Sequence, residues 1–403
     1  MFKMILKLAW NNAFLRLSRT LLVIIMIAVS MSMMLSIQGI YDGMTLNMVN
    51  SALRSDSGEI SIYNKNYRLD KQIVNDIQNA GEICADLENN PSVKAVSVRY
   101  SVEGLSATAR KASFSNIIGI DLEEEEKFGA FSKFLKEGEI SFEKRGALLG
   151  AELAKTLKVR IGSKLIFSTQ DKSGDINSIA LKVRGIIQTN NLVIDQRALY
   201  IERKQLYEFL GVDTNTATQI AIRTDDDALI NTIKKEYSEQ EVKSFLELNP
   251  LLKQMEDMMV IFNSITFTIV MLVVFIGILG VMYVSILDRI REFGIMRGIG
   301  MAYNHLRTQI FLEALFVGLA GYSVGAILGF FALYYLQETG LNLSTYAEGM
   351  ASFGMPTIIY AHQEFSYYSN TFYAIVLSSL LSVLLPLRKI KHLHPIDVIK
   401  ADT

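Results

Sequence analysis

Four long stretches without charged residues dominate the pattern of hydrophobic and polar positions along the chain. They are Leu21–Ile40, Met258–Leu287, Ala314–Gln337 and Phe365–Leu387. About 20 apolar residues are enough for a helix to cross the hydrocarbon core of a bilayer, so each stretch predicts a membrane-spanning helix. The block between the first and second stretches has the composition of an ordinary soluble domain. The pattern therefore predicts a membrane protein with a large domain on one side of the membrane.

The basic residues sort by loop and predict the orientation of these helices. They lie before the first stretch, between the second and third, and after the fourth: Lys3, Lys7, Arg16, Arg19, Arg289, Arg291, Arg297, Arg307, Arg388, Lys389, Lys391 and Lys400. The loop from Glu338 to Glu364 carries acidic residues and no Lys or Arg. Because Lys and Arg are enriched in cytoplasmic loops, we expect both termini and the Asp288–Glu313 loop in the cytoplasm. The Tyr41–Asp257 block then lies outside.

The segment Met1–Ser18 mixes apolar residues with Lys3, Lys7 and Arg16. This composition favours a helix in the cytoplasmic interface, with Trp10 at the boundary, over a frayed start of the first span. A cleaved signal peptide is the alternative for the first stretch. Its apolar run exceeds the usual h-region of about 7–15 residues and no clear small-x-small site follows, so we expect a retained helix.

The second stretch is longer than a bilayer requires. At about 1.5 Å per residue it would measure roughly 45 Å, against about 30 Å of hydrocarbon. Leu251, Leu252 and Met255 keep helical spacing after Pro250, which predicts one helix that continues outward as a stalk. A separate linker helix remains the alternative.

Small residues recur at helical spacing in the third stretch. They are Gly318, Gly321, Gly325 and Gly329. Small side chains let helices approach closely in lipid, and the spacing leaves open whether the partner helix belongs to this chain or to a second subunit. Glu313 stands at the cytoplasmic entrance of this span, where we expect it to pair with Arg307 or Arg297. A proton relay is disfavoured because no second acidic residue lies within any span.

The Tyr41–Asp257 block mixes strand-like and helix-like runs. The strand-like runs are Glu59–Tyr63, Val93–Val102, Asn116–Ile120, Lys164–Ser168, Ala180–Ile187, Ala198–Ile201 and Gln219–Arg223. The helix-like runs are Asp70–Leu87, Gly150–Leu157, Lys204–Leu210 and Asp226–Tyr237. Their irregular order favours an α+β domain over a doubly wound sheet. The expected fold class is an α-helical membrane protein with four transmembrane helices and a large α+β extracytoplasmic domain between helices 1 and 2.

The candidate chemistry of this block is sparse. Cys84 is the only cysteine of the chain, and all of its histidines lie outside the block. The sequence has no nucleophile elbow and no phosphate-binding loop. We therefore expect no catalytic residue, no metal site, no cofactor bound by this chain and no nucleic-acid partner.

A short motif between the second and third stretches is more informative. It runs through Arg291, Glu292, Phe293, Gly294, Ile295, Met296, Arg297, Gly298 and Gly300. Apolar residues recur at helical spacing between charges, which predicts a short amphipathic helix that docks against a partner. Its glycines allow close approach or sharp turns.

The chain from this motif onward resembles the permease segment of the MacB/FtsX/LolC-E superfamily, the type VII ABC transporters. The resemblance covers the motif, the Glu313-Ala314 step and the glycine-bearing helix that follows. Leu8–Asn12 resembles the family's opening, and Leu384–Ile390 resembles its proline-bearing ending. Phe293 and Gly298 depart from the pattern, in which Ile or Val and Ala are common. The one-plus-three layout of the spans also matches.

Within the superfamily the chain most resembles the lipoprotein-releasing LolC and LolE permeases. The outer block is of comparable size, and three of its runs resemble theirs: Asn116–Asp121, Gly146–Ala154 and Val159–Leu165. MacB shares similar runs but joins its ATPase to the same chain.

The resemblance implies a non-catalytic permease subunit in the bacterial inner membrane. A separate cytoplasmic ATPase of the LolD type, with ATP and Mg, would bind the short helix at Arg291–Met301. The permease would pair with a second permease chain, identical or related, and pass a lipoprotein to a periplasmic carrier. The alternatives are an FtsX-like mechanotransmission scaffold that activates a cell-wall hydrolase, and a MacB-like export component.

These expectations divide the chain into consecutive segments. They are a cytoplasmic interfacial helix at 1–19, transmembrane helix 1 at 20–40, a periplasmic α+β domain at 41–250, a stalk with transmembrane helix 2 at 251–287, a coupling-helix loop at 288–308, transmembrane helix 3 at 309–337, a periplasmic loop at 338–364, transmembrane helix 4 at 365–387 and a cytoplasmic tail at 388–403.

Overall fold

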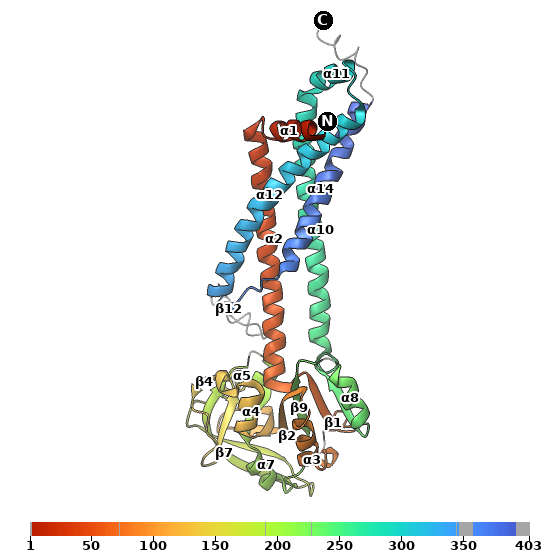
Figure 1. Ribbon diagram of the computed structural model, residues 1–403. Helices are drawn as coiled ribbons and strands as arrows, with labels where there is room; N and C mark the ends of the chain where they lie inside the picture. The colour runs from red at the N-terminus through yellow and green to blue at the C-terminus, as the bar shows by residue number, and fades with distance from the viewer. Residues whose placement is uncertain are drawn as a thin grey trace. The chain divides into compact units, whose positions relative to one another are not determined.

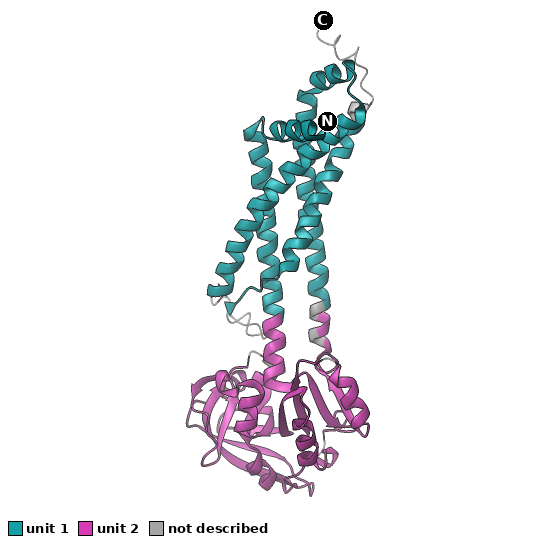
Figure 2. Ribbon diagram, viewed as in Figure 1, with its two compact units in different colours: residues 1–45, 256–342, 358–403 teal, residues 46–255, 343–357 magenta. Residues whose placement is uncertain are grey.

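The computed structural model describes residues 2–71, 73–189, 191–226, 228–343, 345 and 358–391. The chain divides into two compact units, shown in teal and magenta in Figure 2. The first, the helical unit, comprises Met1–Thr45, Glu256–Asn342 and Ile358–Thr403. The second, the α+β unit, comprises Leu46–Met255 and Leu343–Thr357.

The helical unit is built from long helices that run side by side (Figure 1). Its elements are α1 (Phe2–Ala13), α2 (Leu17–Ala52), α10 (Pro250–Asp288), α11 (Ile290–Gly298), α12 (Tyr303–Thr339) and α14 (Phe365–Lys391). Four of them, α2, α10, α12 and α14, are long and apolar enough to cross a membrane, which confirms the four predicted spans. The first and second spans belong to helices that extend well beyond the predicted stretches, and α10 is one continuous helix of 39 residues from Pro250.

A common apolar core holds these helices together. Ile27 and Leu35 of α2 meet Ile278 of α10, Ile310 of α12 and Val383 of α14, all almost fully buried. The segment before α2 is a separate helix and not a frayed start of the span. It buries its small apolar face against α12 and sets the Trp10 ring 5.2 Å from that of Phe316.

The loop between α12 and α14 begins and ends with a short antiparallel pair, β11 (Leu341–Asn342) and β12 (Ile358–Ile359). Residues 344 and 346–357 of the predicted 338–364 loop, and the tail beyond Lys391, lie outside the described residues.

The α+β unit is organised around one ten-stranded sheet with the order β10-β1-β9-β2-β3-β8-β5-β7-β4, while β6 pairs with β2 and β7. Its strands are β1 (Ile60–Asn64), β2 (Val93–Ala107), β3 (Ala112–Ile120), β4 (Leu135–Gly138), β5 (Gly146–Gly150), β6 (Lys164–Gln170), β7 (Ile176–Ile187), β8 (Ala198–Glu202), β9 (Gln219–Thr224) and β10 (Gln240–Ser244). The β3–β8 and β5–β7 pairs are parallel and the others antiparallel. This mixed sheet confirms the α+β prediction.

The long strand β2 joins two lobes of the α+β unit. Its first half, Val93–Arg99, pairs with β9, and its second half, from Tyr100, pairs with β3. The first lobe buries Ile62 and Ile220 of its strands together with Leu87 of α3 (Ala80–Glu88) and Ile233 of α8 (Leu229–Glu236). The second lobe has a larger core around Tyr100, Phe167 and Leu199. Its helices are α4 (Leu122–Gly129), α5 (Ala151–Leu157), α6 (Leu192–Arg197) and α7 (Arg203–Leu210).

Short helical turns connect these elements. They are the π-helix η1 (Leu53–Ser57), the 3-10 turns η2 (Ile73–Asn75) and η3 (Phe131–Phe134), and α9 (Phe245–Leu248).

The predicted helix at Asp70–Leu87 is wrong over its first half. Helix α3 begins only at Ala80, after Asn79, whose φ of 57° is left-handed. Upstream, Ile77 is fully buried and forms an antiparallel bridge with Ala217. An extended backbone at that position satisfies its polar groups through the neighbouring strand, so the helix cannot start earlier.

Candidate functional site

The strongest polar cluster of the helical unit lies at the turn between α10 and α11. Asp288, the last residue of α10, accepts a hydrogen bond from Arg19 at 2.6 Å and also pairs with Arg16. Arg19 lies in the first turn of α2 and Arg16 directly precedes that helix. The end of α10 is therefore tied to the start of α2.

The next residue, Arg289, ties the same turn to α12. Its Nη1 lies 3.1 Å from Oε2 of Glu313, and the exposed fractions of the two side chains are 12% and 3%. Glu313 also accepts hydrogen bonds from Asn12 of α1 and Gln309 of α12, each at 3.1 Å. Four acceptor contacts on a buried carboxylate satisfy the charge that burial would otherwise penalise.

Glu313 forms its ion pair with Arg289 and not with the predicted Arg307. Arg307 lies on the exposed face of α12, whereas Glu313 shares the buried face with Leu306 and Gln309. Arg289 reaches the carboxylate because it sits outside both helices, with a φ of −111° at the N-cap of α11.

The predicted amphipathic motif forms α11, and its two faces differ. Phe293 is 1% exposed and packs in the helical core, with the Arg289 guanidinium 5.1 Å from the centre of its ring. Gly294 is also buried, and Met296 and Arg297 are half-buried. The exposed residues are Arg291, Glu292, Ile295, Gly298 and Gly300. Ile295 and the following Ile299 are 49% and 81% exposed, an apolar pair one turn apart.

The predicted glycine face of α12 packs inside this chain. A side chain at Gly321 would start 2.8 Å from Ile27 of α2, and one at Gly325 would start 3.0 Å from the backbone of Ala28. Gly329 faces Leu35 of α2, and Gly318 faces Ser379 of α14. The close approach that these glycines allow is therefore made to α2 and α14 of the same chain.

A leucine at Gly325 should destabilise the helical unit by about 2–3 kcal/mol, because the added side chain overpacks against backbone that cannot yield. Gly280 of α10 is the matched control, since nothing lies within 4 Å of its added Cβ atom. Thermal unfolding of both variants in the same detergent, followed by Trp10 fluorescence, measures the difference. Equal midpoints for Gly325→Leu and Gly280→Leu would contradict the close α2–α12 packing.

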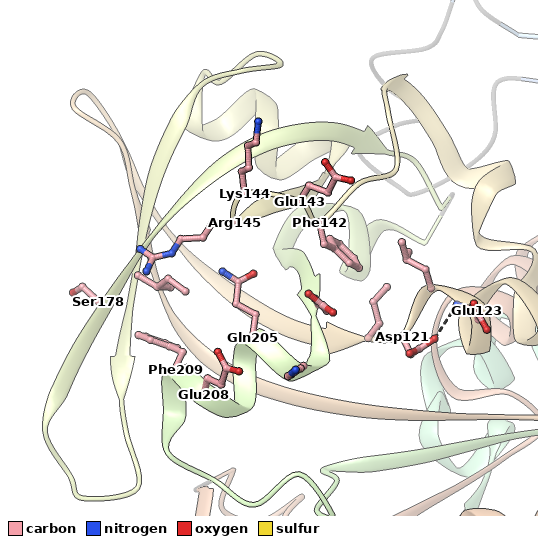
Figure 3. A pocket seen from close by; sticks show the side chains of 15 residues that line it. Asp121, Glu123, Phe142, Glu143, Lys144, Arg145, Ser178, Gln205, Glu208 and Phe209 are labelled. Atoms are coloured by element: carbon pink, nitrogen blue, oxygen red, sulfur yellow. Dashed lines mark hydrogen bonds between the residues drawn. The ribbon is translucent and has the colours of Figure 1, made fainter.

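The α+β unit offers a second candidate, an open groove of about 910 Å³ between the β4–β5 connection and α7 (Figure 3). Phe142, Glu143 and Lys144 line one side, and Gln205 and Glu208 of α7 line the other. Acidic and basic side chains are mixed along it. No nucleophile paired with a base stands out among these lining residues, and the described residues hold no group of three or more His, Cys, Asp or Glu that could bind a metal ion.

Comparisons with known proteins agree with this architecture. The model for the MacB-like periplasmic core domain matches residues 20–239, and the model for the FtsX-like permease C-terminal region matches residues 264–395. Helices α10, α11, α12 and α14 supply the second match, so the Asp288–Arg289 turn and α11 lie inside it.

Three curated relatives are similar to the chain at low identity. The lipoprotein-releasing system transmembrane protein LolE of Haemophilus influenzae is 24% identical over 281 residues, which cover 66% of this chain and 64% of LolE. LolC of Buchnera aphidicola is 25% identical over 247 residues, covering 57% and 59%. The macrolide export protein MacB of Haemophilus ducreyi is 24% identical over 200 residues, covering 45% and 28%. The chain thus spans less than two thirds of the length of each relative.

Two solved structures resemble part of the chain. The extracellular domain of the transporter YknZ from Gram-positive bacteria is 12% identical, covers 46% of this chain and 98% of its own, and gives a TM-score of 0.32. The periplasmic region of MacB from Actinobacillus actinomycetemcomitans is 17% identical, covers 49% and 92%, and gives a TM-score of 0.33.

Proposed function

Because the chain belongs to the MacB/FtsX/LolC-E superfamily of ABC transporter permeases, we propose that it is a permease subunit worked by a separate cytoplasmic ATPase that docks on α11. The ATPase would bind ATP and Mg, and this chain would transmit its motion. In this proposal both termini and α11 face the cytoplasm and the α+β unit faces the periplasm.

The observation that carries the proposal is the way α11 is held. Phe293 anchors one face in the helical core, while Ile295 and Ile299 are presented outward. The turn before α11 is bound through Asp288 to the start of α2 and through Arg289 to Glu313 of α12, which in turn accepts a hydrogen bond from Asn12 of α1. A force on α11 would therefore reach several helices at once instead of deforming a loop.

The favoured substrate is a lipoprotein released from the membrane to a periplasmic carrier, since two relatives are named for lipoprotein release. Removing an acyl chain from a bilayer costs about 0.8 kcal/mol per CH₂ group, so extraction calls for a fuel-consuming partner. The apolar exposed face of α10, with Ile261, Ile265 and Leu272, is available to lipid or to a second permease chain.

The second candidate function is export of a periplasmic substrate. It is favoured by the match of the α+β unit to the MacB-like core domain and by the MacB relative.

Bound acylated peptide in the purified complex supports lipoprotein release, and a co-purified cell-wall hydrolase instead supports the FtsX-like scaffold.

Glutamates at Ile295 and Ile299 should abolish ATPase docking, because two charges would replace the exposed apolar pair at the proposed interface. The full chain is purified in detergent from its native host, and the co-purified ATPase is identified and quantified by mass spectrometry. Ile176→Glu is the matched control, since this isoleucine is 80% exposed in the α+β unit. An unchanged amount of ATPase with the double variant overturns the docking proposal.

A further inference from the structure

A second cavity, of about 240 Å³, lies inside the α+β unit where its two lobes meet. The first lobe contributes Tyr63 and Tyr67, and the second contributes Asn116 of β3 and Tyr200 of β8. Ser55 of the π-helix η1 completes the wall between them. A cavity of this size is several times the roughly 30 Å³ that one water molecule occupies in the liquid, so it has room for a small organic molecule.

Two buried polar atoms at this cavity have no hydrogen-bond partner among the described residues. They are Oγ of Ser55, whose residue is 5% exposed, and Oδ1 of Asn116. Buried polar atoms are almost always paired, so an unpartnered pair lining one cavity points to a bound molecule that supplies hydrogen-bond donors.

The local backbone is unusual at the same place. Ser55 and Asp56 lie in η1, a five-residue π-helix. Such turns are rare and often occur at functional sites, because the extra residue per turn re-aims side chains. Here the turn brings the hydroxyl and the carboxylate of consecutive residues to one cavity.

The charged side chains at the cavity differ in whether they have a partner. Each of the three lining cations has a carboxylate partner: Lys71 with Glu103 at 2.6 Å, Arg68 with Glu241 at 3.4 Å and Arg99 with Glu125 at 2.8 Å. The Asp56 carboxylate has no hydrogen bond or ion pair within the described part of the chain. Asp56 is thus the lining carboxylate without a bonded partner, which favours a ligand that brings its own positive charge.

The walls fit a cation as well. The rings of Tyr63 and Tyr67 stack with their centres 6.3 Å apart, and Tyr200 lines the opposite lobe. Aromatic faces attract ammonium and guanidinium groups. An anion finds no such partner, since the guanidinium and ammonium groups that line the cavity are already engaged.

We propose that this cavity binds a small organic cation with a primary ammonium or guanidinium group. Asp56 is its counter-ion, and Ser55 Oγ and Asn116 Oδ1 accept its N–H groups. Both lobes and the residues that precede α10, Leu248 and Asn249, line the site, so an occupied cavity would hold these parts of the α+β unit together. The proposal is independent of the proposed permease function.

Isothermal titration calorimetry on the full chain in detergent tests the proposal, with putrescine as probe in an amine-free buffer. The neutral diol 1,4-butanediol, of the same carbon length, is the ligand control. Putrescine should bind the unmodified chain, and its affinity for Asp56→Asn should be at least tenfold weaker. Its affinity for Asp175→Asn should be unchanged, because Asp175 is an exposed aspartate of the β6–β7 turn.

Several outcomes would overturn the proposal. They are no binding to the unmodified chain, equal binding of the diol, or unchanged binding to Asp56→Asn. Should Asp56→Asn fail to fold by thermal unfolding, Ser55→Ala decides instead, because it removes only the unpartnered hydroxyl. If the affinity of Ser55→Ala for putrescine is within twofold of that of the unmodified chain, the assignment of the cavity as a cation site is overturned.

Discussion

Replacing Glu125 by alanine should destabilise the α+β unit by about 3–5 kcal/mol, among the largest effects of any single change in this domain. Glu125 and Arg99 form an ion pair whose side chains are 2% and 4% exposed, with Nη2 and Oε2 2.8 Å apart. Ser97 also donates a hydrogen bond to the carboxylate at 2.7 Å. Removing the carboxylate would leave a guanidinium charge in the protein interior without its partner.

The pair lies where the two lobes meet, which explains the size of the expected effect. Burial opposes a charge on Arg99, but the neighbouring Glu125 carboxylate outweighs it and holds the pKa of the guanidinium above its usual range. Arg99 also stacks over the Phe128 ring at 5.0 Å and donates to the backbone carbonyl of Asp56 in η1. Helix α4 is thereby fixed to the middle of β2.

Hydrogen exchange of the β2 amides in the full chain measures this loss of stability. Tryptophan fluorescence is unsuitable here, because Trp10, the only tryptophan, lies in the helical unit. Glu123→Ala in the same helix is the control, since Glu123 is exposed and its removal should change little. Replacing both partners, as Arg99→Met with Glu125→Leu, should restore much of the stability because no unpaired charge remains. Protection of β2 that is unchanged in Glu125→Ala contradicts the expected role of the pair.

The sequence predicts the four spans well, because an uncharged apolar run of about 20 or more residues has few other stable environments. The glycines of α12 face α2 and α14, and this choice of partner helices could not be predicted, since helical spacing defines a face and not what covers it. The same limit applies to Glu313: its position at a helix end indicates an arginine partner, yet the choice of Arg289 depends on the turn between α10 and α11.

Strands were missed where the alternating pattern fails. β5, Gly146–Gly150, is buried along its whole length and so has no polar face. β4 and β10 lie at the two ends of the sheet order and are short and largely polar, as edge strands often are. The cation cavity was beyond sequence reasoning, because Ser55, Tyr67 and Asn116 come together only through the pairing of distant strands.

Replacing Glu313 by glutamine should uncouple the motion of α11 from the rest of the helical unit. Its effect on ATP hydrolysis by the complex should exceed that of any other single change in this unit. The variant leaves the Arg289 guanidinium, whose side chain is 12% exposed, beside a neutral amide. Removing one charge of a buried ion pair lowers the free energy of unfolding by about 3 kcal/mol. The turn before α11 then loses its charged tie to α12. Since Ile295 and Ile299 are untouched, the ATPase should still co-purify in the normal amount.

ATP hydrolysis by the purified complex separates docking from coupling. Under the proposed function, the part of the hydrolysis rate that substrate stimulates should fall at least tenfold in Glu313→Gln, since each 1.4 kcal/mol corresponds to about a factor of ten. Glu338→Gln, an exposed glutamate near the other end of α12, should leave this rate unchanged. Arg289→Met combined with Glu313→Leu should recover thermal stability, because both charges are gone, but not stimulated hydrolysis, because α11 is no longer held by an ion pair. If stimulated hydrolysis survives in Glu313→Gln while the ATPase remains bound, force passes from α11 by another route, through the Phe293 contact and the Asp288 pairs alone.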